Sequence, residues 1–301
     1  MSDNFPSIGE PVLDPSEKFP EGGVDKYDLL LADGGAVDKN THPLYYAIAR
    51  QLDYTGFSFD VSVVNIEPYA IDWDGTYFWV SGFGGPIIEV PRVWRFDSNG
   101  VYTGFYIDAS ATHGQYERIF GLTAKDSFLW IQDRGDSDGI QSMYYKYFKT
   151  GGYAGESRSL LAQDGDMRAI KWDGTYFWAC GRITERVYQY DSDFVYTGFS
   201  FPAIKPNTGI AVIGSEIFVT EGGAGVKDEV NVYSKQGVYI GLAGNISAED
   251  TTMRGLTSRG VNLFSVGASN DRVYEYAQVS ATPIMTSPDP LCPYRIVADL
   301  T

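Results

Sequence analysis

The chain has 301 residues, 44% of them hydrophobic and 15% aromatic, and it carries a net charge of −16. This composition supplies a sizeable core, which excludes a chain that is disordered along its whole length. The acidity repels phosphate backbones and anionic headgroups, and no apolar run approaches the roughly 18 residues of a membrane span. We therefore expect no nucleic-acid partner and no membrane insertion.

Residues 1–48 are the first predicted region, an extended arm rich in Gly, Pro and Asp. The stretch after Pro43 allows either one short helix or an additional strand. The N-terminus has no basic segment followed by an apolar core, so we predict no secretory signal and expect synthesis in a cytoplasm. Arms of this kind either tether a domain to a neighbouring subunit or remain disordered.

The string WDGTYFW occurs at residues 73–79 and again at 172–178. It belongs to a longer unit with five copies, each anchored on a turn residue that has an aromatic residue four positions later. The anchors are Gly75, Asp126, Gly174, Gly214 and Gly260. A small residue stands five positions before each anchor and is followed by an aliphatic one. These small residues are Ala70, Gly121, Ala169, Gly209 and Gly255. Internal repeats of roughly this length are typical of propellers and solenoids.

Two further strands complete most units. The third has alternating Val, Tyr and Phe residues, as in RVYQYD at 186–191, and this period of two predicts a β-strand. The fourth contains VYTGF or a similar string, but one copy, DYTGF at 53–57, lies before the first unit, and the last unit lacks one. We therefore predict an all-β fold, a five-bladed β-propeller whose ring is closed by pairing Tyr54–Phe59 with Arg272–Ala277.

The predicted propeller spans residues 49–278 and is followed by a C-terminal extension, residues 279–301. Four prolines exclude a regular central strand throughout that extension. An alternative is that the extension completes an irregular sixth sheet, which would give six blades. Cys180 and Cys292 form either one disulfide or two free thiols.

The segments Ile71–Gly82 and Ile170–Gly181, with the third strands, resemble the superfamily of NHL-type and streptogramin-lyase-like propellers. The resemblance covers about residues 50–278 and implies the propeller fold. It leaves function open, because that superfamily includes enzymes, ligand binders and scaffolds. Such repeats with unrelated ends also resemble bacteriophage virion proteins of the tail or fibre type, which implies a virion location, assembly in the host cytoplasm and other subunits of the particle as partners.

Motifs for catalysis are scarce. Of the two histidines, His42 lies in the arm, and only His113, with Glu117 nearby, is a candidate for histidine-based chemistry. No GxSxG, P-loop, HExxH or CxxC pattern occurs. Paired carboxylates near the starts of the inner strands could act as in a glycosidase, although 39 acidic residues produce such pairs by chance. The candidates are Glu67, Glu117, Asp164 and Asp166.

The loop DRGDSDG at 133–139 is the one candidate for a bound cation. It clusters Asp133, Asp136 and Asp138 with glycines that permit tight turns, which suits Ca²⁺. The alternative is an acidic surface loop without a metal. We expect no other cofactor.

Positions at which the repeats differ are the best candidates for a binding site, because a residue shared by every unit builds the scaffold. The position before the small residue is occupied by Tyr69, Phe120, Arg168, Thr208 and Arg254. With the inner strands in register, these residues form a ring at one mouth of the channel, where arginines and aromatic rings could bind an anionic or carbohydrate ligand. The alternative is that the arginines pair with local acids such as Glu67 and Asp166.

We predict a non-enzymatic structural or recognition module of a larger assembly, such as a phage particle. In this interpretation the propeller presents a rigid surface, the arms anchor it to other subunits, and a surface glycan is a candidate ligand. Two alternatives stay open: a carbohydrate-active hydrolase or lyase that uses channel carboxylates, and a glycan-binding lectin without catalysis.

Overall fold

The computed structural model describes residues 50–64, 67–83, 90–110, 112, 119–133, 142–221, 228–280, 284–285 and 296–297. Contacts divide the chain into two units. One comprises residues 52–239 and 243–278 and holds the blades; the other comprises residues 1–51, 240–242 and 279–301. In the second unit, β21 (Ile284–Met285) pairs with β22 (Ile296–Val297) as a separate two-stranded sheet, so it supplies no sixth blade.

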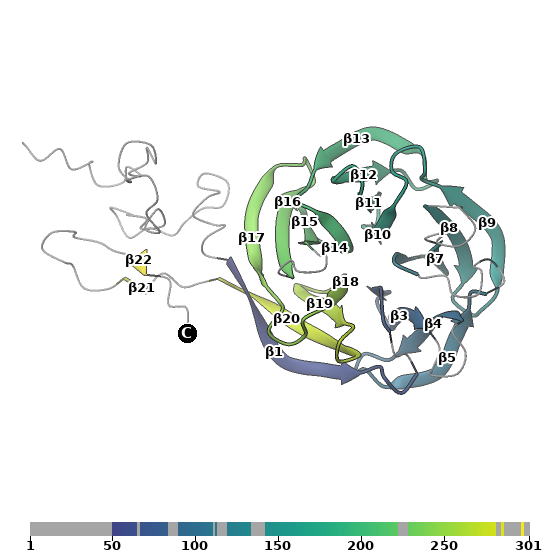
Figure 1. The fold of residues 1–301 in the computed structure, drawn as a ribbon, viewed down its shortest axis with the longest axis horizontal. Coiled ribbons are helices and arrows are strands. Elements are labelled where there is room, and N and C mark those ends of the chain that lie inside the picture. Colours follow the sequence, from purple (N-terminus) through teal and green to yellow (C-terminus); the bar gives the residue numbers. More distant parts are fainter. Residues whose placement is uncertain are drawn as a thin grey trace, which may run out of the picture. The chain divides into compact units, whose positions relative to one another are not determined.

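The first unit is a ring of five four-stranded sheets, which confirms the predicted all-β, five-bladed propeller (Figure 1). Blade 1 consists of β2 (Ile71–Trp73), β3 (Phe78–Phe83), β4 (Pro91–Phe96) and β5 (Tyr102–Asp108). Blade 2 consists of β6 (Leu122–Lys125), β7 (Phe128–Asp133), β8 (Met143–Phe148) and β9 (Tyr153–Ser159). Blade 3 consists of β10 (Met167–Trp172), β11 (Phe177–Gly181), β12 (Arg186–Tyr190) and β13 (Tyr196–Pro202).

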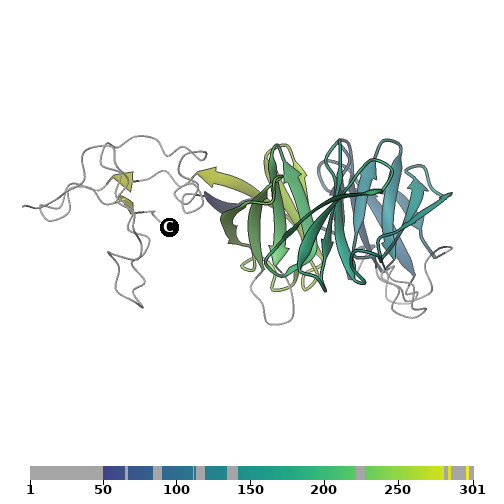
Figure 2. The same ribbon diagram turned by 90° about the horizontal axis from the view of Figure 1, so that it is seen from above.

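Blade 4 consists of β14 (Pro206–Ile213), β15 (Glu216–Glu221), β16 (Glu229–Ser234) and β17 (Tyr239–Asn245). Blade 5 consists of β18 (Met253–Arg259), β19 (Asn262–Gly267), β20 (Arg272–Ser280) and, outermost, β1 (Arg50–Asp60). The innermost strands contact one another in the cyclic order β2, β6, β10, β14, β18 and back to β2. Figure 2 shows the blades standing side by side, seen along their edges. The described residues include no helix of the length and apolarity that crossing a membrane needs.

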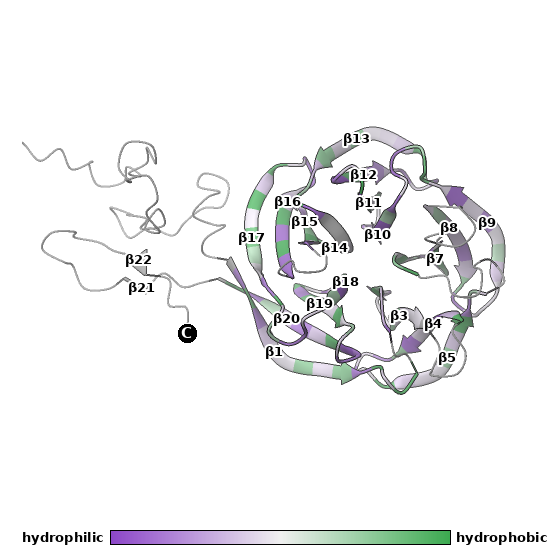
Figure 3. Ribbon diagram, viewed as in Figure 1, coloured by the Kyte–Doolittle hydropathy of each residue, from purple (hydrophilic) through white to green (hydrophobic). Residues whose placement is uncertain are grey.

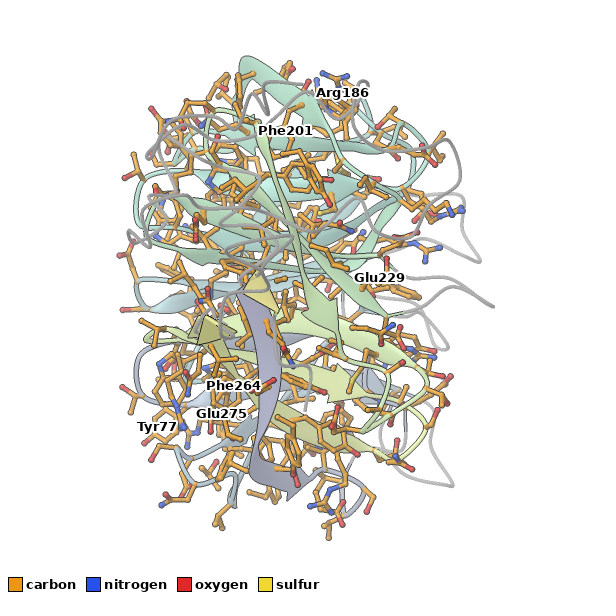
Figure 4. The ribbon with its side chains drawn as sticks, turned by 90° about the vertical axis from the view of Figure 1, so that its left-hand side faces the viewer. Tyr77, Arg186, Phe201, Glu229, Phe264 and Glu275 are labelled. Atoms are coloured by element: carbon orange, nitrogen blue, oxygen red, sulfur yellow. The ribbon has the colours of Figure 1, made fainter. Side chains whose placement is uncertain are left out.

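The ring closes where the sequence predicted, with β1 beside β20. The Val61 amide donates to the Asp271 carbonyl at 2.9 Å, and the Thr55 hydroxyl donates to the Glu275 carboxylate at 3.0 Å. The order of these contacts shows that the two strands run antiparallel. Figure 4 looks onto this edge, with Glu275 labelled beside β1. The start of the chain therefore completes the blade that its end begins.

The repeated string WDGTYFW makes the same hydrogen bonds in blades 1 and 3. In blade 1 the Asp74 carboxylate accepts from the Thr76 and Tyr77 amides at 2.9 and 2.8 Å, and from the Trp79 indole at 2.9 Å. In blade 3 Asp173 accepts from the equivalent groups at 2.8, 2.7 and 2.9 Å. Each aspartate thus fixes a turn and, through the indole, the tryptophan that packs against the next blade.

Both copies are held between cations from the two neighbouring blades. From the following blade, Lys149 pairs with Asp74 at 3.0 Å, and Lys235 pairs with Asp173 at 2.6 Å. From the preceding blade, the Arg259 guanidinium stacks on the Trp73 ring at 5.7 Å, and the Lys125 ammonium stacks on the Trp172 ring at 4.8 Å. The string therefore recurs because two blades use one design for joining both neighbours.

The core lies between successive blades. The shared aromatic residue of the second strand is almost fully buried in every blade; it is Trp79, Trp130, Trp178, Phe218 or Phe264. Trp79 packs with Leu129 of blade 2, and Trp178 packs with Ile217 of blade 4. The repeated aromatic residues therefore pack between blades, as expected of residues that every unit shares.

The outer strands carry a built-in irregularity. The glycine of the YTG string has positive φ in Gly56, Gly104 and Gly198, at 87°, 81° and 87°. Register shifts accompany it, for example between Trp94 and Phe96. Such bulges bend an exposed strand and hinder pairing with another chain. In Figure 3 the outer strands β1 and β17 carry mixed hydrophilic and hydrophobic colours, as expected of strands with one face in water.

Candidate functional site

The five predicted mouth residues stand before the small residues at the heads of the inner strands. We call Tyr69, Phe120, Arg168, Thr208 and Arg254 the mouth ring. The small residues are required because neighbouring strands approach backbone to backbone: a Cβ on Gly121 would lie 2.5 Å from the Arg168 carbonyl oxygen. Likewise, a Cβ on Gly209 would lie 2.9 Å from the Arg254 carbonyl oxygen. This close approach brings the mouth residues of neighbouring blades together.

Four members of the mouth ring form one continuous stack. The ring centroids of Tyr69 and Phe120 are 4.6 Å apart. The Arg254 guanidinium carbon lies 3.9 Å from the Tyr69 centroid, and that of Arg168 lies 5.0 Å from the Phe120 centroid. Thr208 is not part of this stack. It precedes Gly209, which lies against the strand that carries Arg254. The two arginines thus flank a pair of aromatic rings, an arrangement that cation–π attraction stabilises.

The aromatic rings fill the mouth instead of lining an open cup. Tyr69 is 2% exposed and Phe120 is 6% exposed. The side chains of Arg168 and Arg254 are 12% and 18% exposed. Thr208 is 6% exposed, and its hydroxyl has no hydrogen-bond partner among the described residues. A ligand at this mouth would therefore meet guanidinium edges, not aromatic faces.

Both mouth arginines pair with local acids, which is the alternative that the sequence left open. Arg168 Nε lies 3.0 Å from Asp166, which also pairs with Arg182 at 2.5 Å. Arg254 Nη2 lies 3.7 Å from Glu67. Burial alone would raise the pKa of Asp166, but the hydrogen bonds and charges of Arg168 and Arg182 outweigh it and hold that pKa below its ordinary value.

Of the other predicted acids, only Asp164 lies within the described residues. Asp164 is 3% exposed, and its carboxylate accepts from the Thr184 amide at 2.7 Å and from the Asp166 amide at 2.6 Å. It therefore organises the turn between blades 2 and 3. Glu117, His42 and His113 lie outside the described residues.

A second acidic group, which the sequence analysis missed, lies around blade 5. Asp250 accepts from the amides of Thr252 and Asn270, both at 2.8 Å. Burial raises the pKa of Asp228 to about 6, with a further increase from Asp250. Burial raises the pKa of Asp271 to about 6 as well, helped by Asp250 and other acids and opposed by Arg254. Carboxyl groups with raised pKa values are candidates for a functional site. No sequence motif distinguishes these three from the rest of the 39 acidic residues.

A third polar group occupies the axis below the mouth. Asp72, 1% exposed, forms an ion pair with Lys171 and accepts from the Thr257 hydroxyl at 2.8 Å and from the Ala124 amide at 2.7 Å. The sequence carries a signal for it: AIDWDGTYFW and AIKWDGTYFW differ at one position, which is Asp72 in one copy and Lys171 in the other. Because every group in this cluster is paired, it joins four blades and offers no free binding capacity.

The predicted metal loop is largely outside the described residues. Asp133 is the last residue of β7, whereas Asp136 and Asp138 lie in residues 134–141, which the structure does not describe. The described part of the chain contains no group of three or more His, Cys, Asp or Glu residues that could hold a metal ion. Cys180 is a buried free thiol, and burial raises its pKa. Cys292 lies outside the described residues.

Comparisons with known proteins show similarity of fold. No family model matches the chain, and no curated protein matches it. The glutaminyl cyclase of Myxococcus xanthus superposes with a TM-score of 0.57 at 9% identity, covering 76% of this chain and 97% of that one. The virginiamycin B lyase of Staphylococcus aureus gives 0.42 at 14% identity, covering 70% and 66%. BamB of Moraxella catarrhalis gives 0.37 at 15% identity, covering 70% and 57%. The chain is thus a β-propeller, a class that includes enzymes and non-enzymes.

Proposed function

We propose that this chain is a non-enzymatic recognition module that binds a neutral, polyhydroxylated ligand, such as a surface glycan, at the mouth ring. The observation that carries the proposal is the charge balance of the mouth. Arg254 lies beside Glu67 and Arg168 beside Asp166, so donors and acceptors alternate around it. A sugar needs both kinds of group, whereas an anion needs positive charge that is not already neutralised.

The mouth is also rigid, which favours binding. The two arginines are fixed by aromatic stacking as well as by ion pairs, and the strands beneath them are held by contacts between blade backbones. Binding to side chains that are already ordered loses little conformational entropy.

We further propose that the module belongs to a larger assembly, of which a phage tail or fibre is the leading candidate. Support comes from the antiparallel pairing of β1 and β20, which brings Thr55 and Ser58 of β1 beside Glu275 and Arg272 of β20. β1 is thus the outermost strand of blade 5, and the residues that precede it in the chain are the ones that we propose as the anchor. Deletion of residues 1–48 should then abolish assembly with the partner subunit while the thermal unfolding transition of the propeller stays in place. Assembly that survives the deletion would refute anchoring by the arm.

The ligand proposal is tested by screening the full chain on a broad glycan array. Binding that is lost in Arg254→Ala and kept in Arg158→Ala, a substitution on the outer strand β9, supports it. No binding across the array contradicts it. Hydrolysis or elimination of a bound glycan by the unmodified chain would place the protein among carbohydrate-active enzymes instead.

A further inference from the structure

The joints between consecutive blades can be compared with one another, because the same positions recur in each repeat. Between blades 2 and 3 the joint is centred on Ser142, which is 1% exposed and whose carbonyl accepts from the Leu160 amide at 2.9 Å. Its hydroxyl accepts from the Met167 amide at 2.9 Å and donates to the Asp164 carbonyl, also at 2.9 Å. One hydroxyl therefore ties the third strand of blade 2 to the segment that starts blade 3.

Between blades 4 and 5 the same place is taken by Asp228. Its carbonyl accepts from the Ile246 amide at 2.9 Å, as that of Ser142 does from Leu160. Its carboxylate accepts from the Met253 amide, the counterpart of Met167. Asp228 is 6% exposed, and its Oδ2 has no hydrogen-bond partner among the described residues.

The acceptor opposite this joint also has a counterpart. Asp250 stands four residues after Ile246 and three before Met253, just as Asp164 stands relative to Leu160 and Met167. Asp250 accepts from the Asn270 amide at 2.8 Å, and Asp164 accepts from the Thr184 amide at 2.7 Å. The two joints are therefore built alike except for one side chain, a serine in one and an aspartate in the other.

We propose that Asp228 acts in its protonated form as a hydrogen-bond donor to the Asp250 carbonyl, in the way that Ser142 donates to Asp164, and so positions the start of β18. An ionised carboxylate has acceptors only, so at this place one of its buried oxygens would face another acceptor. A carboxylic acid has one hydroxyl that can donate while its other oxygen accepts from Met253. The joint between blades 4 and 5 is then sensitive to pH, and the joint between blades 2 and 3 is not.

The charges around Asp228 favour its neutral form. Asp250 faces it from the segment before β18 and disfavours a second negative charge. Glu229, the next residue, lies on β16 opposite Glu221 of β15, and Glu221 is paired with Lys205 at 3.4 Å. On β18 the cation nearest to Met253 in the sequence is Arg254, the next residue, and its charge is balanced by Glu67. Burial, and secondarily Asp250, raise the pKa of Asp228 from 3.8 to about 6, against the opposing hydrogen bond from Met253.

The sign of the effect follows from this direction. A carboxyl whose pKa is higher in the folded than in the unfolded state stabilises the fold most at low pH, and that stability is lost as the pH rises through the folded value. Asp271, whose pKa burial also raises to about 6, contributes in the same direction and must be separated by mutation. Because Met253 precedes Arg254, the same titration would alter the mouth ring. That last consequence rests on the proposed function, whereas the effect on stability does not.

The test is urea unfolding of the full chain between pH 5 and 7 without ligand. The unfolding constant of the natural chain should rise about tenfold over this range through Asp228. Asp228→Asn, whose amide can donate and accept at once, should remove that rise, and Asp271→Asn should leave it. Ser142→Asp should introduce a new loss of stability with rising pH at the other joint.

Two results would overturn the proposal. One is an Asp228→Asn chain that keeps the full dependence on pH; the other is a Ser142→Asp chain whose stability changes equally at every pH. Because no ligand is present, either result leaves the proposed glycan site untouched, and failure of the glycan screen leaves the joint untouched.

Discussion

Glu275 is predicted to hold the ring closed, since it joins the first strand of the chain to the last blade. It is 8% exposed, and its carboxylate accepts from the Thr55 hydroxyl at 3.0 Å and from the Asn262 amide group at 3.0 Å. It also pairs with Arg259 at 3.3 Å. Arg259 in turn donates to the Ser98 carbonyl of blade 1 at 2.7 Å, so the network crosses the closing joint.

Replacing Glu275 with Ala should lower the free energy of unfolding by about 2 kcal/mol. Breaking a fully buried ion pair by removing one partner costs roughly 3–5 kcal/mol. The Arg259 side chain is 29% exposed, so water relieves part of that penalty for the cation left behind. The assay is urea unfolding followed by tryptophan fluorescence, combined with hydrogen exchange of the β1 amides, which should become faster in the variant.

The matched control lies in blade 3, where Gln189 occupies the same position and accepts from the Thr197 hydroxyl at 2.9 Å. Gln189→Ala removes a comparable bond inside a blade formed by continuous chain, and should cost about 1 kcal/mol. It should leave exchange at β1 unchanged. If both variants lose the same stability and neither speeds exchange at β1, then Glu275 is not a closing residue.

Other substitutions test the joints between blades. Asp74→Asn and Asp173→Asn should each cost about 1–2 kcal/mol, and by similar amounts, because the two turns make the same bonds; unequal losses in urea unfolding would contradict this. Burial would raise the pKa of each of these carboxyl groups, but the hydrogen bonds that they accept outweigh it and lower both pKa values. Their contribution to the free energy of unfolding is therefore present above about pH 4 and is lost as the pH falls further. Acid unfolding of the natural chain and of each variant measures this loss. Gly255→Ala should lower the free energy of unfolding far more than Gly56→Ala. A Cβ added at Gly255 would lie 2.6 Å from the backbone of blade 1. A Cβ added at Gly56 would meet nothing within 4 Å, so only the positive φ of 87° opposes that substitution. Lys171→Met should cost about 3 kcal/mol, because it leaves a buried carboxylate at the axis without its cation, and thermal unfolding that matches the natural chain would refute this.

The sequence predicted the blades and their closure because those features depend on repetition, which a single chain displays. The small residues at the axis, such as Gly121 and Gly209, were found by the same repetition, and the structure supplies their reason, the backbone-to-backbone approach of neighbouring inner strands. The mouth ring was placed by the same alignment. The sequence could not predict that Tyr69 and Phe120 fill the mouth, because their packing on each other depends on how two strands from different blades are inclined.

Contacts between unlike positions escaped prediction. Lys149 and Lys235 lie in turns, and their partners Asp74 and Asp173 belong to other blades, so no spacing within one repeat reveals the pairs. The ion pair at the axis was accessible in principle, since two nearly identical strings differ by one exchanged charge. The importance of Asp228 emerges only when its joint is compared with that of Ser142, which requires the hydrogen bonds and not the residue types alone.

The most direct test of the proposed function is the affinity of the full chain for the glycan that binds best on the array. Titration calorimetry of the natural chain, Arg254→Ala and Arg158→Ala at one pH would measure it. The proposed site predicts affinity at least about tenfold weaker for Arg254→Ala, equivalent to about 1.4 kcal/mol, and no change for Arg158→Ala. Equal affinities for all three chains would show that the ligand binds elsewhere than at the mouth ring.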